Sequence, residues 1–160
     1  GQESGPWGTK IKMMSDLAIS IGCKVKSIDY RGVEAADHRV KKLIDACSTI
    51  NDPICLVGSS MGGFVASAAA MDVRAVGLFV LAPAYFMKGF EYTPFEVANI
   101  PTEIVHGWHD DIVPVENSIR FAQQNQSKIH IVNGDHRLTK NIKDINIYLE
   151  IFLNQFILDS

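Results

Sequence analysis

The feature that most constrains the fold of this chain is a short turn between an apolar run and a helix-prone stretch. The apolar run covers residues 54–57, the turn residues 58–62 and the stretch residues 64–70. The turn reads Gly-Ser-Ser-Met-Gly and so has the form G-x-S-x-G, with Ser60 at its centre. A strand, a tight turn and a helix in this order are typical of a nucleophile elbow, which exposes a serine side chain at the end of a strand. Ser60 is therefore the candidate nucleophile.

The residues beside Ser60 suit such a turn. A nucleophile on a strained backbone needs small neighbours, because a side chain two positions away would collide with the adjoining strand or helix. We expect Gly58 and Gly62 to provide this clearance. The N-terminus of the following helix favours the negative charge that develops in acyl transfer. The backbone N–H of Met61 is therefore a candidate oxyanion donor, whereas Ser59 occupies a variable position of the motif and fits the role of nucleophile less well.

Two segments further along the chain provide candidates for a base and an acid. A serine hydroxyl needs a base to become a good nucleophile, and the base needs an acid that holds it in one tautomer. Residues 102–106 are predicted to form a strand, and the loop after it contains Asp110. Residues 128–132 are predicted to form the next strand, and the loop after it contains His136. We assign Asp110 as the acid and His136 as the base; Asp111 is an alternative acid.

Strands and helices alternate along the chain. Residues 24–29 are predicted to form a further strand, and a continuous apolar run predicts another at residues 76–81. Apolar residues recur at helical spacing in segments outside the elbow, namely residues 9–21, 40–47, 114–124 and 145–156. The alternation predicts an α/β fold with a doubly wound, mostly parallel sheet and helices on both faces, formed by residues 1–160 as a single domain. Such sheets place their sites at the carboxyl ends of the strands, where all three candidates fall.

The order and local sequence of the candidates resemble the α/β-hydrolase superfamily. The chain contains G-x-S-x-G-G around Ser60, H-G-x-x-D-x-x-V-P around Asp110 and G-D-H at His136. These motifs follow the chain order of that superfamily. The resemblance spans essentially the whole chain. It implies a minimal α/β-hydrolase fold without a lid domain, and a serine hydrolase that cleaves carboxylic esters or thioesters of small acyl groups through an acyl-enzyme intermediate.

Two alternatives stay open at this point. A peptidase or a lactonase would use the same three residues on the same fold. A catalytically weak or inactive interaction module is the other alternative, because one fold hosts many functions. The resemblance implies no organic cofactor and no metal. His106 and His109 flank the acid loop, but no third ligand stands in register with them.

The resemblance also bears on the first residues of the chain. Residues 1–6 resemble the segment that follows the histidine of the superfamily's oxyanion loop, which implies Gln2 as the second backbone donor. The superfamily inserts the strand that feeds this loop between the strands matching residues 25–29 and 54–57. No residues of the chain supply that strand, and without it two rows of backbone groups would lack partners. We therefore expect the native polypeptide to carry about ten apolar-rich residues upstream of Gly1.

The stretch between Pro83 and Pro101 is the irregular part of the chain. In the superfamily this position often holds a cap over the site, and about eighteen residues suffice for only a short flap. Its aromatic residues Tyr85, Phe86 and Phe90 are candidates to line an acyl pocket. The same side chains are equally suited to packing the loop onto the edge of the sheet. A site with so little cover favours small esters or thioesters.

Composition gives no indication of a nucleic-acid or membrane partner. Hydrophobic residues make up 47% of the chain, and the formal net charge is −3. The densest basic cluster, Arg39, Lys41 and Lys42, lies within one predicted helix and is typical of a solvated helix face. A small-molecule ester or thioester is thus the expected partner, and the sequence leaves the oligomeric state open.

The cysteines indicate a reducing environment. Cys23, Cys47 and Cys55 fall in apolar stretches and lack the spacing of a metal site. We interpret them as reduced core residues. The sequence contains no run of about eighteen apolar residues and no recognisable signal peptide, which favours a cytoplasmic location.

Overall fold

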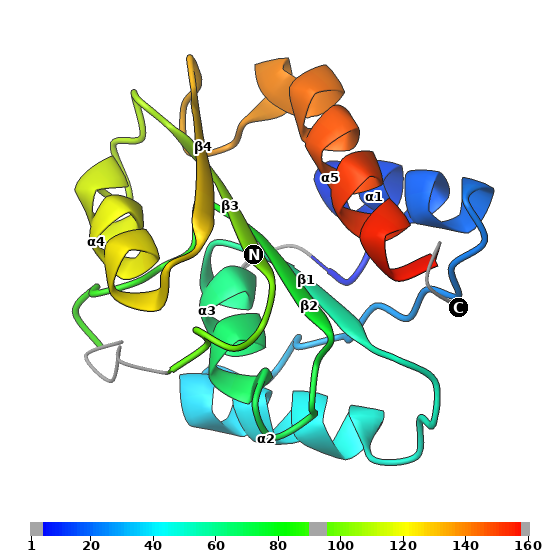
Figure 1. The fold of residues 1–160 in the computed structure, drawn as a ribbon. Helices are drawn as coiled ribbons and strands as arrows, with labels where there is room; N and C mark the ends of the chain where they lie inside the picture. Colours follow the sequence, from blue (N-terminus) through cyan, green and yellow to red (C-terminus); the bar gives the residue numbers. More distant parts are fainter. Residues whose placement is uncertain (1–4, 90–95, 158–160) are drawn as a thin grey trace.

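A parallel sheet forms the centre of the molecule (Figure 1). The computed structural model describes residues 5–89 and 96–157. Within them the sheet has four strands in the order β1-β2-β3-β4, and each neighbouring pair is parallel. Their bounds are β1 Cys55–Ser59, β2 Gly77–Leu81, β3 Thr102–Gly107 and β4 Lys128–Val132. The predicted fold class, a doubly wound parallel sheet, is confirmed.

The register of the strands brings their carboxyl ends to one edge. Ser59 of β1 pairs with Leu81 of β2, and Leu81 pairs with Val105 of β3. Gly107 at the end of β3 pairs with Val132 at the end of β4. The loops that leave β1, β3 and β4 therefore start beside one another, which is the arrangement that places a site at this edge.

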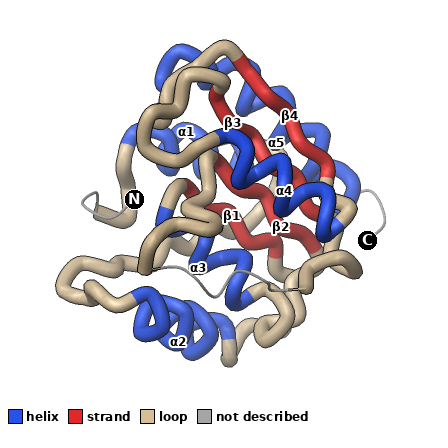
Figure 2. Tube along the Cα trace, turned by 90° about the vertical axis from the view of Figure 1, so that its left-hand side faces the viewer, coloured by secondary structure: helices blue, strands red, loops and turns tan. Residues whose placement is uncertain are grey.

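Helices cover both faces of the sheet. Helices α1 (Thr9–Ser20) and α5 (Ile142–Ile157) pack together on one face, whereas α3 (Met61–Ala69) and α4 (Val115–Asn125) cover the other. Helix α2 (Ala36–Cys47) packs against α3. Figures 1 and 2 show this arrangement from two directions. A short 3₁₀ helix, η1 (Thr139–Asn141), precedes α5.

The central strand β2 supplies both halves of the core. Its residues Leu78, Phe79, Val80 and Leu81 have no exposed surface. Leu78 and Val80 belong to the cluster under α3, and Phe79 and Leu81 belong to the cluster under α1 and α5. Successive side chains of a strand point to opposite faces, so a continuous apolar run indicates a strand that is covered on both sides.

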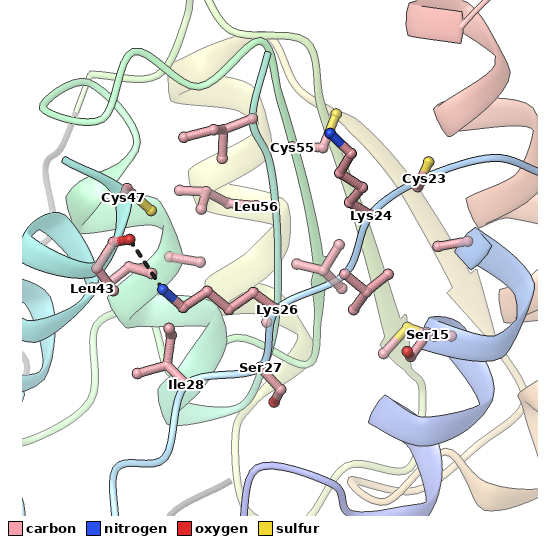
Figure 3. A pocket seen from close by; sticks show the side chains of 18 of the residues that line it. Ser15, Cys23, Lys24, Lys26, Ser27, Ile28, Leu43, Cys47, Cys55 and Leu56 are labelled. Atoms are coloured by element: carbon pink, nitrogen blue, oxygen red, sulfur yellow. Dashed lines mark hydrogen bonds between the residues drawn. The ribbon is translucent and has the colours of Figure 1, made fainter. Parts of the chain in front are cut away.

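The predicted strand at residues 24–29 is wrong. The structure assigns no regular element to residues 23–30. These residues lie across a groove of about 970 Å³ from β1, and Figure 3 shows this groove with Lys26 extending across it to the carbonyl of Ala46. A strand needs a neighbour for its backbone hydrogen bonds, and no strand of the described sheet pairs with residues 24–29.

The outer side of β1 is unpaired along the same groove. The carbonyl of Ile54 and the N–H of Ser60 both bond toward β2. Because backbone groups alternate in direction along a parallel strand, those of Cys55, Val57 and Ser59 face the groove. In the described part of the chain no strand pairs with this side of β1.

The cysteines lie around the groove, at the margin of the two core clusters. Cys23, Cys47 and Cys55 are free thiols of intermediate exposure, and all of them line the groove (Figure 3). Burial raises the pKa of Cys55 to about 12 and also raises the pKa values of Cys23 and Cys47. All three are free thiols that pack against the core clusters, so they are core residues as interpreted from the sequence, but only partly buried ones at the margin of the core. Among the described residues no helix is both long and apolar enough to cross a membrane.

Candidate active site

Ser60 occupies a strained turn between β1 and α3. Its backbone has φ 56° and ψ −120°, in the left-handed half of conformational space that non-glycine residues rarely adopt. Backbone hydrogen bonds hold this conformation: the N–H of Ser60 donates to Leu81, and its carbonyl accepts from Gly63, Phe64 and Ala84. Such strain costs roughly 1–3 kcal/mol and persists only where the surroundings enforce it. The strand, tight turn and helix predicted around Ser60 are thus present, and its role as nucleophile stays a prediction.

The elbow is most closely packed around Gly58 and Gly63. A Cβ atom on Gly58 would lie 2.2 Å from the carbonyl oxygen of Gly62, so Gly58 must lack a side chain, as expected. A Cβ atom on Gly62 would meet nothing within 4 Å among the described residues, and the expected clearance role of Gly62 is therefore wrong. A Cβ atom on Gly63 would lie 3.0 Å from Cβ of Pro83. The elbow thus uses the backbone of Gly62 but needs no small side chain there.

Asp110 lies in the loop after β3, and its carboxylate accepts hydrogen bonds on both oxygens. Oδ1 accepts from the backbone N–H groups of Ile112 and Val113 at 2.9 and 2.8 Å. Oδ2 accepts from Nδ1 of His136 at 2.7 Å and lies 3.0 Å from Nε2 of His106. Burial alone would raise the pKa of this carboxyl, but the hydrogen bonds from both histidines and from the backbone outweigh it and hold the pKa well below its ordinary value. Asp110 is therefore ionised at neutral pH.

His136 connects Asp110 to Ser60. The loops after β3 and β4 pack so closely that a Cβ atom on Gly107 would lie 2.1 Å from the carbonyl oxygen of Gly134. His136 follows Gly134 by two residues, and its Nε2 lies 3.0 Å from Oγ of Ser60. With Nδ1–H donated to Asp110, Nε2 of the neutral ring is free to accept the hydroxyl proton of Ser60. The three side chains form one continuous chain of hydrogen bonds.

The alternative acid, Asp111, and the alternative nucleophile, Ser59, take no part in this chain of hydrogen bonds. Asp111 is exposed, and no described contact connects it to His136. The hydroxyl of Ser59 accepts a hydrogen bond from Nζ of Lys10 at 3.2 Å.

Met61, the first candidate oxyanion donor, is the first residue of α3, and within the described part of the chain its N–H has no hydrogen-bond partner. Gln2 lies outside the described residues.

The three aromatic candidates for an acyl pocket have different positions. Tyr85 has no exposed surface; its hydroxyl lies 2.6 Å from Oγ of Ser67, and its ring stacks on Phe121 with 3.9 Å between centroids. The structure therefore places Tyr85 in the core, which corrects its assignment to a pocket. Phe86 is partly exposed, and the guanidinium carbon of Arg120 lies 4.1 Å from its ring centroid. Phe90 lies outside the described residues.

Sequence reasoning missed two residues close to the site. Lys10 on α1 is largely buried, and burial lowers the pKa of its ammonium group, whereas nearby Asp135 and Asp110 raise it. His106 at the end of β3 was weighed only as a metal ligand, yet it is fully buried against Asp110. Lys10 gave no signal in the sequence, because a lysine on a helix is ordinarily solvated. A histidine inside an apolar strand was a signal that could have identified His106. Among the residues described, no group of three or more metal-binding side chains occurs.

The family can now be assigned. A parallel sheet with a serine elbow after one strand, and an acid and a histidine after two later strands, is the architecture of the α/β hydrolases. The family model of the alpha/beta hydrolase domain matches residues 31–147, and the chain belongs to this family. Among curated proteins no sequence matches significantly.

Solved structures share the fold over nearly all of this chain. A protein from Xanthomonas campestris pv. campestris, described as a hydrolase of the alpha/beta superfamily, is 25% identical, with a TM-score of 0.85 over 97% of this chain and 95% of its own. Est1E from Butyrivibrio proteoclasticus is 18% identical, with a TM-score of 0.83 over 99% and 86%. An esterase from Pyrococcus furiosus is 18% identical, with a TM-score of 0.71 over 97% and 79%. The general activity of the chain is that of a hydrolase.

Proposed function

We propose that the protein is a serine hydrolase that cleaves carboxylic esters or thioesters of small acyl groups. The observation that carries this proposal is the continuous chain of hydrogen bonds from Ser60 through His136 to Asp110. Its distances of 3.0 and 2.7 Å are those of a nucleophile, a base and an orienting acid. The strained backbone of Ser60 supports the same role, because proteins retain such conformations mainly at functional sites.

The reaction proceeds through an acyl-enzyme. Oγ of Ser60 attacks the carbonyl carbon of the substrate while Nε2 of His136 takes the hydroxyl proton. Asp110 holds the ring in the tautomer that accepts this proton and stabilises the imidazolium that forms. The proton then goes to the leaving alcohol or thiol, and water releases the acyl group by the same steps in reverse. Met61 N–H is the candidate donor to the oxyanion, and Gln2 remains the candidate second donor.

The class of substrate follows from the surroundings of the site. The connection from β2 to β3 covers residues 82–101, and about twenty residues are too few for a lid domain. So short a connection provides little cover, which favours short acyl groups over long-chain lipids. The names of two structural neighbours, Est1E and the Pyrococcus furiosus esterase, agree with an ester as the substrate.

Labelling with a fluorophosphonate tests the proposal. The probe reacts with an activated serine, and intact mass with peptide mapping locates the adduct. We expect one adduct per chain on Ser60 in the unmodified protein, and none in Ser60→Ala or His136→Ala. Hydrolysis of short-chain p-nitrophenyl esters and acyl thioesters then compares the two substrate classes. A folded protein that forms no adduct would contradict the proposal and favour an interaction module.

A further inference from the structure

A second histidine contacts the acid of the site, and we propose that this residue, His106, positions Asp110 for catalysis. The inference rests on the proposed function, because it gives His106 a part in the same hydrogen-bonded chain. His106 acts through Asp110, so it is a positioning residue rather than a catalytic one. Its position within β3, four residues before Asp110, connects the acid to a strand that is buried along its whole length.

The surroundings of His106 determine which ring nitrogen carries the proton. The ring has no exposed surface. Its Nε2 lies 2.9 Å from the carbonyl oxygen of Val113 and 3.0 Å from Oδ2 of Asp110. Both neighbours are acceptors only, and an unprotonated nitrogen facing them would leave three acceptors in contact without a proton. Nε2 therefore carries a hydrogen and donates it to Val113 and Asp110 together.

The other ring nitrogen fixes the charge and the orientation of His106. Nδ1 lies 2.7 Å from Oγ of Ser118 on α4, and Ser118 is fully buried. Within the described part of the chain, His106 is the hydrogen-bond partner found for this hydroxyl. The hydroxyl proton of Ser118 therefore points at Nδ1, which leaves His106 neutral. Helix α4 thus holds the ring so that Nε2–H faces the acid.

A neutral donor at this position suits the reaction. Oδ1 of Asp110 already accepts two backbone N–H groups, and His106 adds a contact to Oδ2, the oxygen that accepts Nδ1–H of His136. Rotation of the carboxylate would break bonds on both oxygens, so its direction toward His136 is fixed. A neutral His106 adds no positive charge beside the imidazolium that forms on His136 during attack. The acid is held in place and its negative charge remains available to the base.

The alternative is that His106 only satisfies buried polar groups, and three substitutions separate these roles. His106→Leu fills the space but removes both ring nitrogens. His106→Gln retains a long side chain with an N–H donor that can reach Asp110. Ser118→Ala keeps the imidazole and removes the group that orients it. His130→Leu is the matched control, because His130 on β4 also contacts a carboxylate, Glu103, with 2.8 Å between Nε2 and Oε2, but takes no part in the chain to Ser60.

The measurements are kcat and KM for a short-chain p-nitrophenyl ester, the thermal midpoint of unfolding, and the NMR signal of the Nδ1 proton of His136. We expect His106→Leu to lower kcat roughly tenfold with KM unchanged, which is the size of a lost hydrogen bond to a charged group. We expect His106→Gln to recover most of kcat and Ser118→Ala to lose a few-fold. The His136 signal should shift in His106→Leu and return toward its original position in His106→Gln. His130→Leu should alter neither kcat nor this signal.

Each outcome either supports or overturns the inference. If His106→Leu and His106→Gln lose kcat equally, and their thermal midpoints fall equally as well, His106 has only a structural role. A folded His106→Leu with the kcat and the His136 signal of the original protein would overturn it outright. If His106→Leu does not fold, Ser118→Ala and His106→Gln decide by the same readouts. If the original protein neither hydrolyses esters nor labels on Ser60, the proposed function fails, and the His136 signal alone still tests the effect of His106 on Asp110.

Discussion

The two edges of the sheet differ in their surroundings, although within the described residues both edge strands, β1 and β4, pair on one side only. Toward β4, the strands pair along their length, and the loops after β3 and β4 lock together through Gly107 and Gly134. At the opposite edge, the backbone groups of Cys55, Val57 and Ser59 on β1 face a groove. Residues 23–30, across this groove, form no strand. Asp110 and His136 lie in the loops after β3 and β4, while Ser60 directly follows β1, the strand beside the groove. The site therefore depends on one well-supported side and one edge that is supported chiefly by β2 and α3.

The largest expected effect is the loss of activity on substitution of Ser60. Ser60→Ala should lower kcat by about 10⁴-fold or more, since the remaining groups cannot form the acyl-enzyme. Ser59→Ala is the matched control in the next position and should stay within a few-fold of the original rate. The measurement is steady-state hydrolysis of a short-chain ester. Retained turnover in Ser60→Ala would move the chemistry to another residue.

The next effect is on stability at the elbow itself. Gly58→Ala should lower the free energy of unfolding by more than about 3 kcal/mol, because its Cβ would overlap the backbone of Gly62. Gly62→Ala should change it by less than about 1 kcal/mol, because the new methyl group meets open space. Urea denaturation of both variants gives the comparison. Equal losses would mean that the crowding lies at both glycines.

Matched valines compare the two sides directly. Val105 on β3 has no exposed surface, whereas Val57 on β1 is 38% exposed at the groove. Val105→Ala should lower the free energy of unfolding by roughly 2–3 kcal/mol and Val57→Ala by less than about 1 kcal/mol. Denaturant unfolding measures both. A loss for Val57→Ala as large as that for Val105→Ala would show that the groove is covered in solution.

A smaller effect is the pH dependence of stability that comes from Asp110, in the loop after β3. The pKa of Asp110 is lower in the folded protein than its ordinary value, so folding stabilises its ionised form. This contribution is complete above the ordinary carboxyl pKa of about 4, and it is lost as the pH falls from there through the lower folded pKa. The stability of the original protein should therefore fall more steeply below pH 4 than that of Asp110→Asn. Urea midpoints at several acidic pH values test this, and parallel curves for the two proteins would contradict it.

The smallest effect is the rate of thiol alkylation along the groove. Burial raises the pKa of Cys55, beside the β1 edge, to about 12. Only about one part in 10⁴ of such a thiol is ionised at pH 8, and the thiolate is the reactive form. Iodoacetamide should therefore modify Cys23 and Cys47 before Cys55, as followed by peptide mapping. Faster reaction at Cys55 would indicate that the edge of β1 opens to solvent.

Sequence patterns predicted the structure correctly where residues near one another in the chain determine it. Strands β1 to β4 lie within a residue or two of the predicted segments. For β1 and β2 the signal was an apolar run, because a buried strand is apolar over consecutive positions. The spacing of the motifs placed Ser60, Asp110 and His136 after strands, and parallel strands end at one edge. Pattern failed for residues 24–29, since a segment with the pattern of a strand also needs a paired neighbour to become one.

The sequence by itself determined the order of strands and helices and the three residues at the carboxyl edge, because these follow from periodicity and from short motifs. Tertiary structure alone decided which residues support them. Gly63 rather than Gly62 needs a bare backbone because Pro83 packs against it. Tyr85 lies in the core because Ser67 and Phe121 receive it there. His106 reaches Asp110 because β3 and the loop after it fold back on each other, a contact that depends on three-dimensional distance.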